Sequence, residues 1–472
     1  MSIYPRPSAV AGVRHRWAAS LACAAALTGV VPALASASVR PASDTTILGF
    51  KFPTSSVQAA RAEAASITGG KRIGGSADFL GVVTGLEENA ILAGLEPFEQ
   101  ATGINVRYEG TTDQIAVLNT RVAAGDPPDV VFAEDPEQLI ELARRGKLVP
   151  LNGVVDMASM DADFAKPLLR LGTVDGKLYA YYAIVNYHGL IWYDSDAYNG
   201  PKNPATWSQL SSWAASEAAK GETPWCLGLN SGATTGWPAT NELLEFLFVR
   251  RYGPALAAKW ENGQLPWTSP QVTWAFEELG TLAGSSYTPG GGQGAVSTSY
   301  LQAGADLYAS PPACMLYPQA QWFGSYAPAA IKGATAANTR FFTFPSINKA
   351  FSNVEMVDGN QIALLRDTAQ GRALVAFMST PQYQTMVAET GQLLVPDSAV
   401  PASAYPTALS RRFAQDLVIN KRAQAQTIEL PSDLWSTQVV DELFKDVTAY
   451  LTNPGGLEGY LEDMNQTAGI SS

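Results

Sequence analysis

The sequence contains few of the side chains on which metal binding and nucleophilic catalysis depend. Its 472 residues include two histidines and three cysteines. Once the N-terminal leader described below is removed, His188 is the remaining histidine, which excludes a multi-histidine metal site and weakens any Ser-His-Asp triad. We expect no metal centre and no cofactor, and we interpret His188 as a lone strand or cleft residue.

Basic residues and phosphate-binding loops are also scarce. Lysine and arginine number 31 against 43 aspartates and glutamates, a formal net charge of −12, which disfavours nucleic acid and anionic lipid as partners. Gly69-Gly70-Lys71 has the wrong spacing for a phosphate loop. Gly290–Gly294 follows no strand, so we expect a surface loop there.

Apolar residues, by contrast, are plentiful. They make up 46% of the chain, with 16% charged residues, as in an ordinary soluble globular protein. A chain of 472 residues is too long for one core and predicts two lobes or domains. Eleven tryptophans and eighteen tyrosines exceed what a core needs, and surplus indoles suit stacking on the faces of sugars.

Residues 1–37 have the composition of a secretory signal peptide. A basic start precedes the apolar run Trp17–Val31 and the cleavage pattern Ala33-Leu34-Ala35. We therefore expect an exported protein, periplasmic or associated with the cell envelope. An uncleaved anchor helix is the alternative, and lipidation at Cys23 is disfavoured because Ser20 stands where a lipoprotein signal has leucine.

Cleavage of the leader leaves two cysteines, Cys226 and Cys314. A single remaining pair in an exported chain favours a disulfide between them. Two free, buried thiols are the alternative.

Three short apolar runs, each followed by a polar loop and an amphipathic helix, predict a parallel α/β sheet. The runs are Ala77–Val83, Ile104–Tyr108 and Val130–Ala133, and the helices are Glu88–Thr102, Asp113–Ala124 and Glu137–Arg145. Ligands of open α/β sheets bind at the carboxyl ends of the strands, where these loops gather. Their carboxylates and hydroxyls suit a neutral, hydroxyl-rich ligand and not a phosphate.

The rest of the chain alternates less regularly. Residues 38–74 are rich in Ala, Ser, Thr and Gly without sustained periodicity, which predicts a flexible tether. Strand character is predicted for Leu178–Tyr193 and Val354–Leu365, and one helix for Thr368–Glu389.

Two local features suggest competing chemistries. Glu87, Glu88, Asp113 and Asp135 could converge within the roughly 5–10 Å that separates the carboxylates of glycoside hydrolases. Trp237 instead stands in a loop rich in glycine and hydroxyls, where an exposed indole predicts a platform for a sugar ring.

The order and spacing of several motifs from about Gly75 to Trp435 resemble the family 1 extracellular solute-binding proteins of carbohydrate ABC transporters, especially the alpha-glucoside-type branch. The motifs are Leu95-Glu96-Pro97-Phe98-Glu99-Gln100-Ala101-Thr102-Gly103, Ala124-Gly125-Asp126-Pro127-Pro128-Asp129-Val130, Gly146-Lys147-Leu148-Val149-Pro150-Leu151, Val174-Asp175-Gly176-Lys177-Leu178-Tyr179 and Pro224-Trp225-Cys226-Leu227-Gly228-Leu229.

This resemblance implies a periplasmic-binding-protein-like fold of type II, an α/β fold with two lobes joined by hinge crossovers. The implied crossings lie near Val185-Asn186, Val357-Asp358 and Leu393-Leu394. Residues 75–185 and 358–393 would then form the N-terminal lobe, and residues 186–357 and 394–472 the C-terminal lobe.

The resemblance also implies where a sugar would bind. The residues expected to contact it are Glu87, Glu88, Thr111, Asp113, Asp135, Tyr187, Trp237, Asn241, Trp322, Asp358 and Asn360. Three positions depart from the family pattern. Asp358-Gly359-Asn360 stands where relatives tend to have Gly-Gly-Asp, Thr240-Asn241-Glu242 replaces a Thr-Asp-Trp type of sequence, and Val83 stands where many relatives have Trp or Gln. These departures touch expected sugar contacts, so they argue against assuming alpha-glucoside specificity.

The sequence as a whole predicts a monomeric receptor, not an enzyme, that captures a di- or oligosaccharide and passes it to the permease subunits of an ABC importer. A secreted glycoside hydrolase that uses paired carboxylates is the alternative from another class. A surface protein without a transport role is the third.

Overall fold

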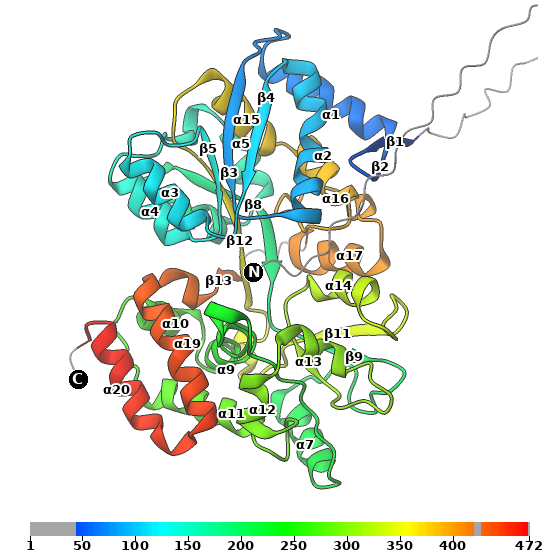
Figure 1. Ribbon diagram of the computed structural model, residues 1–472, viewed down its shortest axis with the longest axis vertical. Coiled ribbons are helices and arrows are strands. Elements are labelled where there is room, and N and C mark those ends of the chain that lie inside the picture. Colours follow the sequence, from blue (N-terminus) through cyan, green and yellow to red (C-terminus); the bar gives the residue numbers. More distant parts are fainter. Residues whose placement is uncertain (1–43, 420–425, 471–472) are drawn as a thin grey trace, which may run out of the picture. The chain divides into compact units, whose positions relative to one another are not determined.

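The structure is a computed structural model that describes residues 44–419 and 426–470 (Figure 1). The predicted signal peptide, residues 1–37, and residues 38–43 of the predicted tether lie outside this part of the chain. Within the described ranges, no helix is both long and apolar enough to cross a membrane.

A six-stranded sheet organises the first part of the described chain. Its strand order is β13-β12-β5-β3-β4, with β8 also paired to β12. Strands β3, β4 and β5 run parallel, as predicted, whereas β12 is antiparallel to β5 and β8. The strands are β3 (Ser76–Gly81), β4 (Asn105–Gly110), β5 (Val130–Ala133), β8 (Ala180–Tyr187), β12 (Glu355–Leu364) and β13 (Thr427–Glu429).

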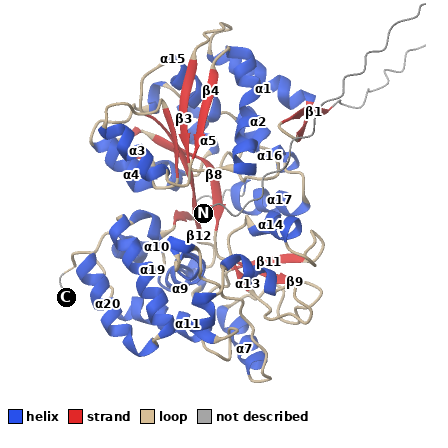
Figure 2. Ribbon diagram, in the orientation of Figure 1, coloured by secondary structure: helices blue, strands red, loops and turns tan. Residues whose placement is uncertain are grey.

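Helices cover both faces of this sheet (Figure 2). Alternate residues of a strand point to opposite faces, so Phe79 and Phe132 join the core under α2 and α15, while Leu80 and Val131 join the core under α3 and α4. The helices of this part are α2 (Gly85–Thr102), α3 (Gln114–Ala123), α4 (Pro136–Arg144), α5 (Met157–Asp163), α6 (Lys166–Leu171), α15 (Ala369–Met378) and α16 (Pro381–Glu389).

The predicted single helix from Thr368 to Glu389 is two helices in the structure. Helix α15 ends at Met378 and α16 starts at Pro381. The hydroxyl of Thr380 accepts a hydrogen bond from the backbone N–H of Tyr383 and so caps α16. Proline at the first helical position lacks the N–H that a continuous helix would need.

The predicted flexible tether is wrong for residues 44–67. A hairpin of β1 (Asp44–Ile47) and β2 (Phe50–Pro53) leads into α1 (Thr54–Ile67). Helix α1 packs against α2, α15 and α16, and its Val57, Ala60 and Ala64 are buried. Alanine has the highest helix propensity, and a stripe of small side chains lets helices approach closely. The alanine content indicated a helix face and not a linker.

Strands β8 and β12 are paired and extend together beyond the helices that cover the sheet (Figure 1). Val357 pairs with Tyr187 and Asp358 pairs with Asn186. The backbone N–H of Val185 donates to the carbonyl oxygen of Leu394 at 2.9 Å. The three chain positions predicted as crossings therefore lie next to one another, joined by backbone pairing.

Beyond the crossing, β9 (Leu190–Asp194) is the central strand of a second, three-stranded sheet with β10 (Tyr317–Pro318) and β11 (Thr339–Thr343). A core rich in tryptophan, including Trp225, Trp260 and Trp267, lies among the surrounding helices. Those that contribute to it are α7 (Trp207–Ala218), α8 (Trp237–Ala239), a π-helix (Thr240–Leu244), α9 (Glu245–Tyr252), α10 (Pro254–Glu261), α11 (Pro270–Leu282), α12 (Gly291–Ser297), α19 (Thr437–Thr452) and α20 (Leu457–Thr467). Helices α13 (Tyr300–Asp306), α14 (Phe323–Ala330) and α17 (Ala408–Phe413) add buried residues to the core that contains Phe79.

Candidate functional site

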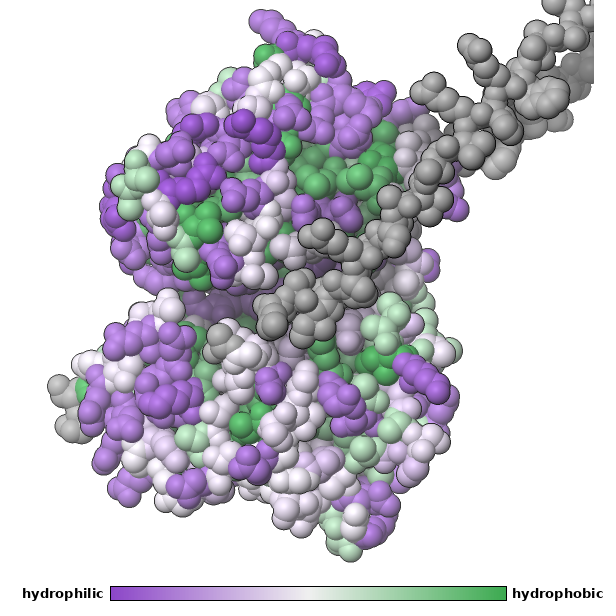
Figure 3. Space-filling view, in the orientation of Figure 1, coloured by the Kyte–Doolittle hydropathy of each residue, from purple (hydrophilic) through white to green (hydrophobic). Residues whose placement is uncertain are grey.

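The polar loops that follow the parallel strands meet at one edge of the large sheet. Val82 to Thr84 follow β3, Thr111 follows β4, and Glu134 and Asp135 follow β5. Because β3, β4 and β5 are parallel neighbours, their carboxyl ends must share that edge. Figure 3 shows hydrophilic residues where the surface is hollowed across the middle of the molecule. The loops at this edge line a recess together with polar and aromatic residues.

Two neighbouring cavities occupy this recess. The larger, of about 400 Å³, is lined by Ile115, Glu134, Asp135, Asn186, His188, Thr234, Trp237, Asn241, Trp322, Asp358, Ser432, Asp433, Trp435, Thr437, Val440, Asp441 and Phe444. The smaller, of about 260 Å³, is lined by Val82, Val83, Thr84, Glu87, Glu134, Asn186, Asp358, Gly359 and Asn360. They share Glu134, Asn186 and Asp358. Together they match the size expected of a small-molecule site.

Most of the residues expected to contact a ligand line these cavities. Asp135, Trp237, Asn241, Trp322 and Asp358 line the larger one. Glu87, Asp358 and Asn360 line the smaller one.

Four of the expected residues do not line either cavity. Glu88 accepts a hydrogen bond from the N–H of Gly85 at the start of α2, and the hydroxyl of Thr111 accepts one from the N–H of Asp113. The side chain of Asp113 is exposed at the N-terminus of α3.

Tyr187 is the clearest correction among the four. It is 3% exposed, and its hydroxyl donates to the carbonyl oxygen of Leu417 at 2.8 Å. Side chains alternate along a strand, so its neighbours Asn186 and His188 face the cavity instead. The expected segment is at the site, but the ring of Tyr187 is in the core.

A further wall comes from residues 432–444, where sequence reasoning named no site residue. Asp433, Trp435, Asp441 and Phe444 all line the larger cavity. The family resemblance extended to Trp435, which was the available signal. The carboxylate Glu134 was also missed, although its loop was recognised.

His188 is held between two carboxylates. Its Nδ1 lies 2.8 Å from Oε1 of Glu242, and its Nε2 lies 3.1 Å from Oδ2 of Asp358. Burial by itself lowers the pKa of His188, but Glu242 and Asp358 outweigh burial and hold that pKa well above its ordinary 6.5. At neutral pH the ring is therefore an imidazolium, and it fixes Asp358 at the cavity wall.

The π-helix Thr240–Leu244 supplies one of these carboxylates. Glu242 has no exposed surface, and its second oxygen accepts a hydrogen bond from the N–H of Gly189 at 3.0 Å. The preceding residue, Asn241, lines the cavity. Single turns of π-helix are frequent at functional sites because they re-aim neighbouring side chains.

The acids of the recess have raised pKa values. Burial, reinforced by Asp358 and Asp135, raises the pKa of Glu134 to about 7, although its carboxylate remains open to water in the recess. Burial likewise raises the pKa of Asp135 and of Glu87. Burial also raises the pKa of Asp433, another residue of the cavity lining, well above its ordinary range, and repulsion by Glu429 adds to this effect. The recess thus concentrates acids that lack cationic partners.

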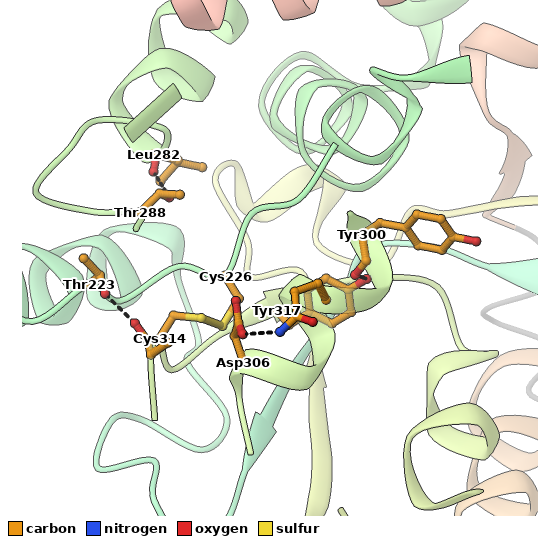
Figure 4. Close-up of a disulfide and its surroundings, with 10 residues drawn as sticks. Thr223, Cys226, Leu282, Thr288, Tyr300, Asp306, Cys314 and Tyr317 are labelled. Atoms are coloured by element: carbon orange, nitrogen blue, oxygen red, sulfur yellow. Dashed lines mark hydrogen bonds between the residues drawn. A yellow bond between two sulfur atoms is a disulfide. The ribbon is translucent and has the colours of Figure 1, made fainter. Parts of the chain in front are cut away.

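Aromatic residues form another part of the cavity lining. The ring of Tyr300 packs edge-on between Trp237 and Trp322, with centroid distances of 5.4 and 6.0 Å. The hydroxyl of Tyr317 donates to the carbonyl oxygen of Tyr300 at 2.8 Å. Tyr317, the first residue of β10, comes shortly after Cys314, which is bonded to Cys226 (Figure 4). The disulfide region thereby supports both indoles through Tyr300.

The buried acid Glu245 makes a testable contribution to stability. Its Oε1 accepts a hydrogen bond from the N–H of Ser432 at 2.8 Å, and burial raises its pKa from 4.5 to about 8. The folded state therefore binds a proton that the unfolded state loses, and this stabilisation is complete below pH 4.5 and disappears as pH rises through about 8.

The free energy of unfolding of the wild type should therefore fall as pH rises from 5 to 8. In the Glu245→Gln variant we expect this fall to be smaller by on the order of a few kcal/mol. Urea unfolding at several pH values measures the difference. Glu462→Gln, on the exposed side of α20, should follow the wild type. Parallel pH profiles for wild type and Glu245→Gln would contradict the expectation.

Among the described residues, no group of three or more His, Cys, Asp or Glu side chains is arranged to hold a metal ion. The recess offers hydrogen-bonding side chains together with indole rings. Such a lining can bind a hydroxylated ring by hydrogen bonds at its edges and apolar contact at its face.

Comparison with known proteins agrees with this arrangement. The sequence model of the bacterial extracellular solute-binding protein family matches residues 84–385. The osmoprotective compounds-binding protein GgtB of Synechocystis sp. is 30% identical over 345 residues, covering 72% of this chain and 80% of GgtB. The alpha-glucosides-binding periplasmic protein AglE of Rhizobium meliloti is 31% identical over 322 residues, covering 65% and 69%.

Solved structures share the fold at lower identity. A chitin oligosaccharide binding protein superposes with a TM-score of 0.67 at 21% identity, over 84% of this chain and 98% of that one. Maltose-bound MalE3 of T. maritima gives a TM-score of 0.64 at 17% identity, over 84% and 99%.

Proposed function

The chain belongs to the family of bacterial extracellular solute-binding proteins, and on that premise we propose that it captures a di- or oligosaccharide outside the membrane and delivers it to an ABC importer. Its α/β fold is that of the type II periplasmic binding proteins, as predicted. The family and the structural neighbours are binding proteins, so a glycoside hydrolase is not favoured.

The observation that carries the proposal is the combination of acids and indoles in one cavity. Asp135 and Asp358, on the sheet edge and the crossing, line it together with Trp237 and Trp322. Hydrogen bonds to charged acceptors are worth about 1.5–3 kcal/mol each. A few of them, together with stacking on an indole, would give a micromolar constant, about −8 kcal/mol.

Capture would proceed by closure of two lobes about the crossing strands. We assign residues 75–185 and 358–393 to one lobe and residues 186–357 and 394–472 to the other, with the hairpin and α1 added to the first. Support comes from the adjacency of β8, β12 and Leu394. A ligand shifts such a hinge only if it touches both lobes.

Its setting follows from the same proposal. Export by the leader at residues 1–37 would place a monomer in the periplasm or cell envelope, where it would dock with permease subunits. GgtB and AglE, which are named as binding proteins for osmoprotective compounds and alpha-glucosides, support a soluble, hydroxylated ligand.

A saccharide panel tests the proposed function. Maltose, trehalose, sucrose, cellobiose and larger oligosaccharides are titrated while tryptophan emission and melting temperature are followed. Chromatography then checks that the sugar is recovered unchanged. We expect at least one saccharide to shift both signals and return intact. Cleavage of a glycan, or no response to any member of the panel, would refute the proposal.

The disulfide belongs to the proposed exported state. Cys226 and Cys314 are 88 residues apart in sequence and bonded in the structure. In the protein without residues 1–37, we expect no titratable thiol before reduction, and a loss of about 4 kcal/mol of stability on reduction in the chain-entropy model. Ellman titration of the denatured protein measures the thiols. Two thiols in unreduced protein would show that the pair is not bonded.

A further inference from the structure

The two cavities are lined by acids without matching bases. Carboxyl groups come from Glu87, Glu134, Asp135, Asp358, Asp433 and Asp441. Among the described residues, no lysine or arginine lines either cavity. The amides and hydroxyls of the lining, such as those of Asn186, Asn241 and Thr437, can donate hydrogen bonds to a sugar, but they do not balance the charge of the acids.

The imidazolium of His188 in the lining does not offset the negative charge of these carboxylates. His188 lies between Glu242, which has no exposed surface, and Asp358. Its positive charge is therefore already matched by a buried carboxylate before any ligand arrives. Burial raises the pKa of Asp433, while Glu87, Asp135 and Asp441 make no ion pair with any described lysine, arginine or histidine.

The aromatic residues of the lining favour the same ligand charge. Indole is the best aromatic partner of a cation, because the face of its π-system is negative. Trp237 and Trp322 both line the larger cavity, and Tyr300 holds them edge-on. An ammonium group in this cavity would lie among both carboxylates and indole rings.

A separate observation marks the smaller cavity as part of a ligand site. Asn360 is 8% exposed and lines that cavity. Within residues 44–419 and 426–470, its side-chain amide makes no hydrogen bond. Because this amide opens on the cavity, it can hydrogen-bond a ligand that enters there. Asp358 lines both cavities and so connects this position with the indoles of the larger cavity.

We propose that the preferred ligand is a saccharide that carries a protonated amine, and that the site disfavours anionic saccharides. This inference rests on the proposed function and specifies its ligand class. An ammonium donates charge-assisted hydrogen bonds to the carboxylates, which are about twice as strong as neutral ones. It also relieves the mutual repulsion of the acids, whereas a phosphate or uronate would add to that repulsion.

Matched sugars test the charge preference. Calorimetric titrations at pH 7 compare trehalose with trehalosamine, N-acetyltrehalosamine and trehalose 6-phosphate. A second series compares cellobiose with the glucosamine disaccharide and its N-acetylated form. In at least one series, we expect the amine to bind about tenfold or more tighter than both neutral forms, and the advantage to shrink as salt screens the charges. The phosphorylated sugar should bind least.

The outcomes separate the two proposals. Equal or tighter binding of the neutral sugars would overturn the amine preference and leave the receptor function standing. Absence of binding by every saccharide in both series and in the wider panel would overturn both.

A charge-neutralising variant gives a second test. Asp441 is exposed on α19, lines the larger cavity and makes no hydrogen bond or ion pair among the described residues, so Asp441→Asn should fold normally. We expect Asp441→Asn, and more so the double variant Glu134→Gln/Asp441→Asn, to reduce the ratio of amine to neutral affinity by roughly threefold or more. Asp196→Asn, exposed after β9 and outside both cavities, is the matched control. An unchanged ratio in the double variant would contradict the proposal.

Discussion

Replacement of Trp237 by alanine is expected to weaken saccharide binding by about 2–4 kcal/mol, the usual effect of removing a central aromatic anchor. This corresponds to a loss of roughly 30- to 700-fold in affinity. The indole lines the larger cavity and packs edge-on against Tyr300. The variant removes the ring face and leaves the acids in place, so hydrogen bonding at the sheet edge persists while stacking is lost. Calorimetric titration with the tightest saccharide of the panel measures the effect.

Trp274→Ala is the matched control for this prediction. Trp274 is also a partly buried indole of the same region, but it packs beneath Arg251, 3.8 Å from ring centroid to guanidinium carbon, and lines neither cavity. Its replacement should lower stability without changing affinity. Equal affinities for wild type and Trp237→Ala would remove Trp237 from the site.

Loss of His188 is expected to destabilise the fold by about 3–5 kcal/mol, as happens when one partner of a buried ion pair is removed. His188→Ala leaves Glu242, which has no exposed surface, and Asp358 without their shared cation. Asp358 also loses the contact that orients it, so saccharide affinity should fall as well. Urea unfolding and calorimetric titration measure the two effects.

The double variant His188→Ala/Glu242→Gln separates charge from packing. A glutamine at position 242 carries no charge and can still accept the hydrogen bond from the N–H of Gly189. We expect the double variant to be more stable than His188→Ala, because the unpaired buried charge has been removed. If the second substitution instead adds to the destabilisation, the ion pair is not what His188 contributes.

The periodic part of the fold could be predicted from the sequence. The buried run Val130–Ala133 is strand β5 with the predicted bounds, and the three strand-loop-helix units form the parallel part of the sheet. These signals are local. A strand buried on both faces and an amphipathic helix can each be recognised from the pattern of residues that are close together in the sequence. The loops after the strands accordingly supplied Glu87 and Asp135 to the candidate site.

What escaped prediction depends on contacts between distant segments. The wall formed by residues 432–444 reaches the site through packing across the chain, as in the 3.4 Å contact between the hydroxyl of Ser432 and Oδ1 of Asn241. The choice between Tyr187 and its neighbours required the register of β8 against β12.

The prediction of a surface loop at residues 290–294 was wrong, again because it depended on a contact between distant segments. Residues 291–297 form α12, which packs against α19. A Cβ atom on Gly292 would lie 1.8 Å from the carbonyl oxygen of Leu451, so the glycine permits a close approach between helices. Helix propensity argued against this element, and tertiary packing overrode it.

Gly359 separates Asp358 from Asn360 on β12, and a methyl group in its place would meet the carbonyl oxygen of Ile184 at 2.2 Å. The acid and the amide that line the cavities thus lie on β12, which pairs closely with β8 in the region of the proposed hinge. A ligand bound to both residues would also restrain this proposed hinge. Ligand binding should consequently slow amide hydrogen exchange along β8 and β12, including at residues of these strands that do not contact the ligand.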